Sequence, residues 1–241
     1  IEAAITPKTK AILLCSPSNP TGAVYSKDEL EAIAKVVEKH ENIFVIADEI
    51  YEHINFTGTH TSIAEFSAIK DRVVVINGVS KAYAMTGWRI GYMAAAEWIA
   101  KACTKLQGQF TTGPTTIAQM ASIEALNGDQ SSLKEMNIAF RRRKDLVLEK
   151  LKDIPGLKYN NPEGAFYVFP DCSAYFGKSD GKTTINSSND FCIYLLENAH
   201  VAMVPGDAFG DPNCFRISFA TSDEKLVEAI ERVKKALGKL H

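Results

Sequence analysis

Apolar and polar positions form alternating blocks over the first half of the chain, and these blocks predict strands and helices in turn. Short apolar runs at 11–15, 43–47 and 73–76 are each stopped by polar or turn-forming residues. Because the runs are apolar at consecutive positions, we expect parallel strands with both faces covered. Residues 88–94 are expected to form a fourth strand. The loop before it is too short for a crossover helix, which favours an antiparallel strand.

Helical periodicity appears between and after these runs. Residues 26–29, Ser-Lys-Asp-Glu, form a capping box, and apolar residues recur behind it at helical spacing. Further helices are expected at about 97–108 and 115–127. A long helix should run from Ser132 to about Asp153, because Pro155 and Gly156 follow there.

The remaining chain has a different pattern of shorter strands and two helices. The expected elements are a strand at 165–169, a polar loop at 177–189, a helix at 190–199, strands at 201–204 and 215–219, and a last helix capped by residues 221–224. We therefore expect an α/β protein. Its first domain, 1–131, has a mostly parallel sheet with helices; a connecting helix, 132–153, leads to a smaller α+β domain, 154–241.

Charge and cysteine usage narrow the range of functions. The 241 residues include 27 Lys and Arg against 29 Asp and Glu, a net charge of −2. Since there is no basic excess and no run long enough to span a bilayer, neither a nucleic acid nor a membrane is expected as a partner. Five cysteines at long spacings, without a C-x-x-C pair, suggest reduced thiols in a cytoplasmic protein. The five histidines show no metal-ligand spacing, and we expect no metal.

Chemically active side chains cluster where the predicted strands end, which is where ligands bind in open α/β sheets. These residues are Asn19 after the first strand, Asp48 and Tyr51 after the second, Ser80 and Lys81 after the third, and Arg89 in the fourth. An amide, a carboxylate, a phenol, an amine and a guanidinium suit a ligand that carries an anion, a basic nitrogen and an electrophilic carbonyl. Pyridoxal 5′-phosphate (PLP) is such a ligand.

Five motifs in order carry a family resemblance. They are Ser-Asn-Pro-Thr-Gly at 18–22, Asp-Glu-Ile-Tyr at 48–51, the segment 80–92 from Ser-Lys to Gly-Tyr, Pro-Glu-Gly-Ala-Phe-Tyr at 162–167 and Phe-Arg-Ile-Ser at 215–218. Together they resemble the class I/II aminotransferases, which are PLP-dependent enzymes of fold type I. The subgroup most resembled is the bacterial aspartate aminotransferase-like one.

The resemblance implies a role for each cofactor-binding residue. Lys81 would attach PLP covalently and then move the proton at the substrate α-carbon. Asp48 would pair with the pyridine nitrogen, while Tyr51 and Asn19 would bond the phenolic oxygen of the ring. Arg89 would bind the phosphate as a bidentate cation.

Two further positions complete the expected site. Related enzymes often carry a phosphate-binding serine three residues before the lysine, where this chain has Gly78. Ser80 is therefore expected to contact the phosphate in its place or only to pack. Arg216 would bind the substrate α-carboxylate, since a planar guanidinium suits two-point recognition, and Asn19 is expected to contact the substrate as well.

The resemblance implies an aminotransferase, aspartate-like, that passes an amino group from an amino acid to a 2-oxo acid such as 2-oxoglutarate, and that forms a homodimer at full length. Two alternatives stay open: a PLP lyase or synthase on the same fold, and the aminotransferase-like effector domain of a transcriptional regulator. Only ten residues precede the first apolar run. Since the family's large domain begins well upstream, we expect a C-terminal fragment that is inactive on its own.

Overall fold

The chain folds into two compact units in a computed structural model that describes residues 1–241. Unit 1 consists of Ile1–Pro17 and Ala23–Asn137. Unit 2 consists of Ser18–Gly22 and Ile138–His241. The chain therefore passes from one unit to the other three times.

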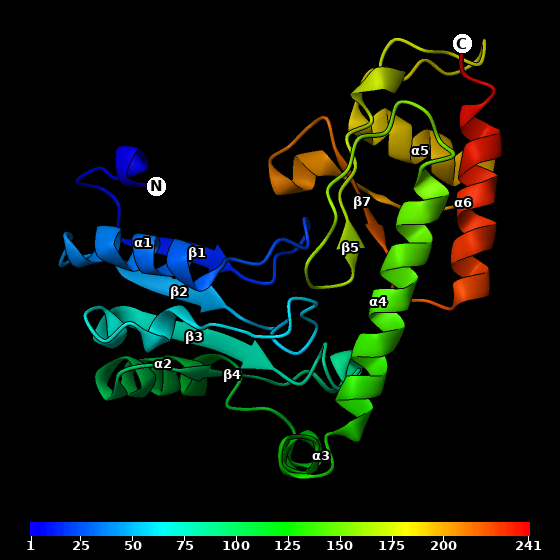
Figure 1. The fold of residues 1–241 in the computed structure, drawn as a ribbon. Coiled ribbons are helices and arrows are strands. Elements are labelled where there is room, and N and C mark those ends of the chain that lie inside the picture. Colours follow the sequence, from blue (N-terminus) through cyan, green and yellow to red (C-terminus); the bar gives the residue numbers. More distant parts are fainter. The chain divides into compact units, whose positions relative to one another are not determined.

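A four-stranded sheet is the centre of unit 1 (Figure 1). Its strands, in spatial as in chain order, are β1 (Ala11–Cys15), β2 (Phe44–Asp48), β3 (Val73–Gly78) and β4 (Gly91–Ala94). β1, β2 and β3 are parallel, and β4 pairs with β3 in the antiparallel direction. Both strand directions predicted from the sequence are confirmed.

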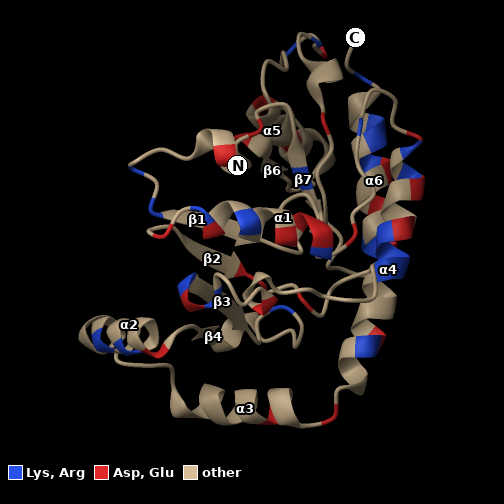
Figure 2. Ribbon diagram, turned by 60° about the vertical axis from the view of Figure 1, so that its left-hand side comes forward, with Lys and Arg blue, Asp and Glu red and all other residues tan.

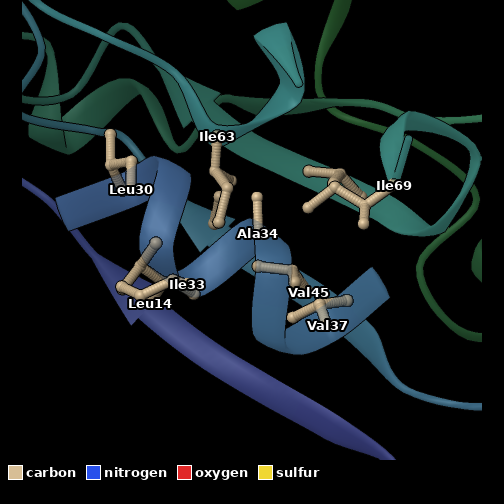
Figure 3. Close-up of a cluster of buried hydrophobic side chains, with 10 residues drawn as sticks. Leu14, Leu30, Ile33, Ala34, Val37, Val45, Ile63 and Ile69 are labelled. Carbon is tan, nitrogen blue, oxygen red and sulfur yellow. The ribbon is translucent and has the colours of Figure 1, made fainter. Parts of the chain in front are cut away.

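Helix α1 (Lys27–Glu38) covers one face of this sheet. It begins at Ser26, whose side chain accepts the N–H of Glu29 while the Glu29 carboxylate accepts the N–H of Ser26, so the predicted capping box is present. Leu30 and Val37 of the helix pack against Leu14 and Val45 of the sheet (Figure 3). The amphipathic spacing of α1 thus places its apolar side on the strands.

The opposite face of the sheet is covered only in part. Trp98 of α2 (Glu97–Phe110) contacts Phe44 edge-on, with ring centroids 5.9 Å apart. Leu13, in the middle of β1, is 75% exposed. The expectation that both faces of these strands are covered is therefore wrong at this position. A run of consecutive apolar residues predicts a strand that can be covered on both faces. The run does not show which other segment covers the second face.

Two helices of unit 1 expose much apolar surface. These are α2 and α3 (Thr116–Asn127), whose exposed apolar residues are Trp98, Leu106, Phe110, Ile117, Met120, Ile123 and Leu126. In Figure 2 the ribbon of α3 is almost free of Lys, Arg, Asp and Glu, in contrast to that of α6 (Asp223–Leu237), which carries residues of both signs. None of the helices combines the length and the apolar character that crossing a bilayer requires.

Unit 2 contains a small antiparallel sheet and three helical segments. The sheet order is β5 (Tyr167–Val168), β7 (Phe215–Ser218) and β6 (Val204–Pro205). Helix α5 (Ser188–Ala199) and α6 belong to this unit, as does the greater part of α4 (Ser131–Leu151), the predicted long helix. The aromatic core includes Phe191, Tyr194, Phe215 and Phe219, all fully buried.

Several boundaries differ from the sequence prediction. β5 and β6 have two residues each, because pairing with the short β7 limits their length. The N-cap of the last helix is Ser222, whose hydroxyl accepts the N–H of Lys225; it lies one residue after the start of the expected cap, and the helix begins at Asp223. The fourth strand begins at Gly91 instead of 88, because residues 86–88 form a short 3-10 turn.

Candidate active site

Neighbouring parallel strands of unit 1 bring an acid and an amine to one edge of the sheet. Asp48 is the last residue of β2, and Lys81 follows three residues after Gly78, the last residue of β3. The Lys81 Nζ lies 5.9 Å from the ring centroid of Tyr51, which is 3% exposed. Three residues predicted from the sequence thus gather at the carboxyl edge of the sheet, where ligands of such sheets bind.

The Asp48 carboxylate is held at a fixed place in the chain turn after β2. Its Oδ1 accepts the N–H of Ile50 at 3.2 Å, and its backbone carbonyl accepts the N–H of Ser16 at 3.2 Å. Within unit 1 the second carboxylate oxygen, Oδ2, accepts no hydrogen bond. Asp48 can therefore present one oxygen to a cationic N–H while the other orients the side chain.

A buried network is centred on Glu49, the residue that follows Asp48 in the chain. Glu49 is 6% exposed; its Oε2 lies 3.0 Å from His60 Nε2, and its Oε1 accepts the Ser62 hydroxyl at 2.6 Å. Burial works to lower the pKa of His60, but the hydrogen bond that His60 donates to Glu49 and the charges of Glu49, Glu52 and Glu65 outweigh it and raise the pKa.

The network of Glu49, His60 and Ser62 was not predicted from the sequence. Ligand atoms of Glu49, Glu52 and His60 lie within 4.8 Å of one another, which is a possible cation-binding arrangement. The spacing of 49, 52 and 60 along a loop matches no familiar metal-binding motif, so no sequence signal could have found it. Both oxygens of Glu49 are already engaged by His60 and Ser62, so the arrangement works as an internal hydrogen-bond network.

Arg89 and Ser80 lie in one loop, which is stabilised by hydrogen bonds from side chains to backbone carbonyls. The Thr86 hydroxyl donates to the Ser80 carbonyl at 3.0 Å, and Arg89 Nη1 donates to the Thr86 carbonyl at 2.9 Å. Arg89 is exposed and adopts left-handed backbone angles, with φ of +56°. The expectation that Arg89 lies in the fourth strand is wrong: it follows the 3-10 turn, two residues before β4.

The structure explains the glycine that stands where related enzymes often have serine. A Cβ at Gly78 would lie 2.9 Å from the Ile90 carbonyl oxygen and 3.0 Å from the Gly91 Cα. Both atoms belong to the backbone at the start of the neighbouring antiparallel strand, so they cannot easily move. Position 78 therefore accommodates no side chain in this chain. This leaves Ser80 as the nearest hydroxyl before Lys81.

In unit 2, the first motif packs against the fourth. The Gly22 carbonyl accepts the N–H groups of Glu163 and Gly164 at 2.8 and 2.9 Å. Gly22 has φ of +68°, and a Cβ there would lie 2.5 Å from the Pro162 Cβ. Only glycine fits this close approach. Segment 18–22 is thus anchored in unit 2 by backbone contacts.

These contacts place Asn19 beside Arg216. Arg216 Nη1 donates to Asn19 Oδ1 at 2.7 Å, although the two residues are 197 positions apart. Arg216 lies on β7, the central strand of its sheet, so it is not an edge-strand surface residue. Its half-buried guanidinium also lies over two aromatic rings, with its carbon 4.5 Å from the Tyr167 centroid and 4.9 Å from the Phe209 centroid. Phe209 was not predicted from the sequence.

Comparisons with known proteins agree with these motifs. The family model described as "Aminotransferase class I and II" matches residues 1–233. An aspartate aminotransferase of Rhizobium meliloti is 48% identical over 100% of this chain, and a bifunctional aspartate aminotransferase and glutamate/aspartate-prephenate aminotransferase of Petunia hybrida is 48% identical over 98%. The chain spans 59% and 50% of their lengths, respectively.

Solved structures show the same relation. The crystal structure of the Rhizobium meliloti aspartate aminotransferase matches with a TM-score of 0.94 at 47% identity, covering 100% of this chain and 61% of that one. An aromatic aminotransferase of Pyrococcus horikoshii matches with a TM-score of 0.88 at 41% identity, covering 98% and 62%. The fold is therefore that of part of a fold type I enzyme, as the sequence predicts. With a family model that matches nearly its whole length, the chain belongs to the class I and II aminotransferases.

Proposed function

We propose that the protein is a PLP-dependent aminotransferase that passes an amino group from an amino acid to a 2-oxo acid. The observation that carries the proposal is the Lys81 amine beside the buried ring of Tyr51, next to the strand that ends in Asp48. An amine that attacks a carbonyl, a carboxylate for a ring nitrogen and a phenol for a ring oxygen meet there. Family membership supports the same chemistry.

The donor set of unit 1 fits PLP. Lys81 would hold its carbonyl carbon, Asp48 Oδ2 its pyridine nitrogen, Tyr51 its phenolic oxygen and Arg89 its phosphate, with the Ser80 hydroxyl close to Lys81 in the chain. When bound, PLP supplies a protonated ring that takes up the electron pair left by the broken Cα–H bond.

The proton transfer and the binding of cofactor and substrate are assigned to residues of the chain. Lys81, once displaced by the amino substrate, would remove the proton from the substrate α-carbon and deliver it to the cofactor. Asp48, oriented by the Ile50 N–H, would accept a hydrogen bond from the ring nitrogen through its other oxygen. Arg216 would bind the α-carboxylate through two N–H groups, while Asn19 accepts a third.

Three finer points belong to the same proposal. The names of the relatives favour aspartate as the amino donor. 2-Oxoglutarate is proposed as the acceptor from the family resemblance alone. A homodimer is proposed from the same family relation. A cytoplasmic location is supported by five free cysteines.

Burial raises the pKa of Cys172, Cys192 and Cys214 to about 12, so none of these thiols is a nucleophile at neutral pH.

Covalent trapping on this chain tests the cofactor assignment without requiring turnover. Incubation with PLP followed by borohydride reduction should fix the cofactor to the peptide that contains Lys81, as read by mass spectrometry. Lys81→Ala should abolish this adduct. Lys70→Ala, which removes an exposed lysine of the same unit, should leave it unchanged. An adduct of undiminished yield in Lys81→Ala would contradict the assignment.

A single-turnover experiment separates the proposed reaction from a lyase on the same fold. Aspartate added to the PLP-loaded full-length protein should yield pyridoxamine phosphate and oxaloacetate in equal amounts, because the amino group stays on the cofactor. A lyase would return PLP unchanged while the substrate loses another group. Detection of unchanged PLP with a shortened or deaminated product would reject the aminotransferase assignment.

A further inference from the structure

Arg216 is held by three neighbours of unit 2, none of which is acidic. Its guanidinium carbon lies over the rings of Tyr167 and Phe209, and its Nη1 donates to Asn19. Within unit 2 no carboxylate forms an ion pair with it, whereas Arg142 and Arg143 both pair with Asp223. A half-buried cation without an anion is costly. Aromatic faces and an amide oxygen offset part of this cost and leave other N–H groups for an incoming carboxylate.

Phe209 is itself fixed by the turn that carries it. It is the last residue of the 3-10 turn Gly206–Phe209, which begins immediately after β6. A Cβ at Gly206 would lie 2.1 Å from the Asp211 carbonyl oxygen, so the turn is closed tightly on the segment that leads into β7. The ring of Phe169 packs edge-on against Phe209, with centroids 5.8 Å apart. Phe209 therefore has a preset position before any ligand binds.

We propose that Phe209 is a positioning residue for carboxylate recognition: with Tyr167, it holds the Arg216 guanidinium in the plane that a substrate carboxylate meets. Tyr167 comes from β5 and Phe209 from the turn beyond β6, so the rings approach Arg216 from the two strands that flank β7. Loss of one ring frees the long side chain to rotate. The rotation must then be stopped when the carboxylate binds, which lowers affinity. This inference rests on the proposed role of Arg216 in binding the substrate carboxylate.

Arginine-selective NMR of this chain, with maleate as an unreactive dicarboxylate probe, tests the proposal. The Arg216 Nε–Hε resonance, assigned by its loss in Arg216→Lys, should be shifted upfield by the two ring faces. Phe209→Leu should move it downfield and weaken maleate binding about fivefold, which corresponds to about 1 kcal/mol, the scale of one cation–π contact. Phe209→Tyr should keep both the shift and the affinity. Phe110→Leu, at a ring that is 84% exposed, should change neither.

The outcomes separate positioning from the proposed role of Arg216. If Arg216→Lys weakens maleate binding while Phe209→Leu leaves it at the wild-type value, the positioning role is overturned and the carboxylate role stands. If wild type and Arg216→Lys bind maleate equally, or neither binds it, the carboxylate role falls and the positioning role with it. A thermal unfolding curve of Phe209→Leu that matches Phe209→Tyr shows that weaker binding does not come from a misfolded chain.

Discussion

Glu49 links the residue that would meet the cofactor to a charged network inside the protein. Its backbone N–H donates to the Ile76 carbonyl of β3 at 2.9 Å, while its side chain binds His60 and Ser62. Asp48 precedes it directly, so the backbone at the end of β2 is held from both strands and from the following loop. The His60 side chain is 16% exposed, so its hydrogen bond with Glu49 is largely shielded from solvent.

The His60–Glu49 pair predicts a pH dependence of stability. Because the pKa of His60 is raised in the folded state above its ordinary value of about 6.5, the pair stabilises fully below that value. The stabilisation is lost as pH rises through the folded-state pKa. Urea unfolding should show a fall in the free energy of unfolding over this range.

Glu49→Gln supplies the test of that pH dependence. It keeps the size of the side chain and removes its charge, so the fall in unfolding free energy above pH 6.5 should become markedly smaller. Glu41→Gln, at an exposed position, should retain the full fall. A pH profile of Glu49→Gln that coincides with the wild-type profile would show that the pair does not couple to folding.

Single residues were predictable from sequence where a local motif carries them. Lys81, Asp48 and Arg216 each lie within a recognisable segment, and the structure places the first two at neighbouring strand ends. Their roles toward a cofactor stay predictions. His60 and Phe209 could not be found in this way, because each acts through a partner that is distant in sequence or belongs to another element.

At the scale of elements, burial determines how much two residues of the same type contribute to stability. Leu30 and Leu13 are both leucines in regular elements, yet Leu30 on α1 is 1% exposed and Leu13 on β1 is 75% exposed. Figure 3 shows Leu30 among the side chains between α1 and the sheet. The periodicity of α1 predicted the first case, whereas the run 11–15 could not indicate which of its residues would remain uncovered.

Truncation of the two leucines should therefore differ sharply. Leu30→Ala should lower the free energy of unfolding of unit 1 by about 2–5 kcal/mol, because it removes buried contacts and leaves a cavity. Leu13→Ala should change it by no more than about 0.5 kcal/mol, as is usual for exposed positions. Urea titration followed by circular dichroism measures both. Similar losses in the two variants would mean that Leu13 is covered in solution, for instance by association of chains.

The boundaries of elements were harder to predict than their order. The sequence predicts strand at residues 88–90, but a 3-10 turn and the left-handed Arg89 lie there, so the strand begins only at Gly91. Backbone reversals of this kind depend on hydrogen bonds such as that from Arg89 to Thr86, which have no sequence signature.

At the scale of the whole molecule, the two units do not follow the order of the chain. The expected domains 1–131, 132–153 and 154–241 are continuous stretches, and that division stays a prediction. The compact units instead group Ser18–Gly22 with Ile138–His241. The hydrogen bonds of Gly22 to Glu163 and Gly164 and of Asn19 to Arg216 explain this grouping. A linear pattern cannot show such a contact over more than a hundred residues.

Gly22 tests how strongly the inserted segment stabilises unit 2. Gly22→Ala should lower its unfolding free energy by well over about 1 kcal/mol, since a methyl group adds a collision with Pro162 to the strain of positive φ. Gly177→Ala is the matched control, because Gly177 has φ of +85° and no atom lies within 4 Å of the place that the added methyl group would take. It reports the backbone strain alone. Equal losses in the two variants would show that the contact with Pro162 is soft.

Because the chain passes between the units three times, the two units cannot be separated by one cut in the polypeptide. A single cut after Asn137 would leave the carboxyl-terminal piece without residues 18–22, and therefore without the amide that meets Arg216. No one boundary in the gene yields unit 2 whole. A separately expressed carboxyl-terminal piece would need these five residues grafted on or added as a peptide. The Arg216–Asn19 pair thus joins residues from opposite ends of the polypeptide, and a piece cut from the carboxyl-terminal half keeps only one of its two members.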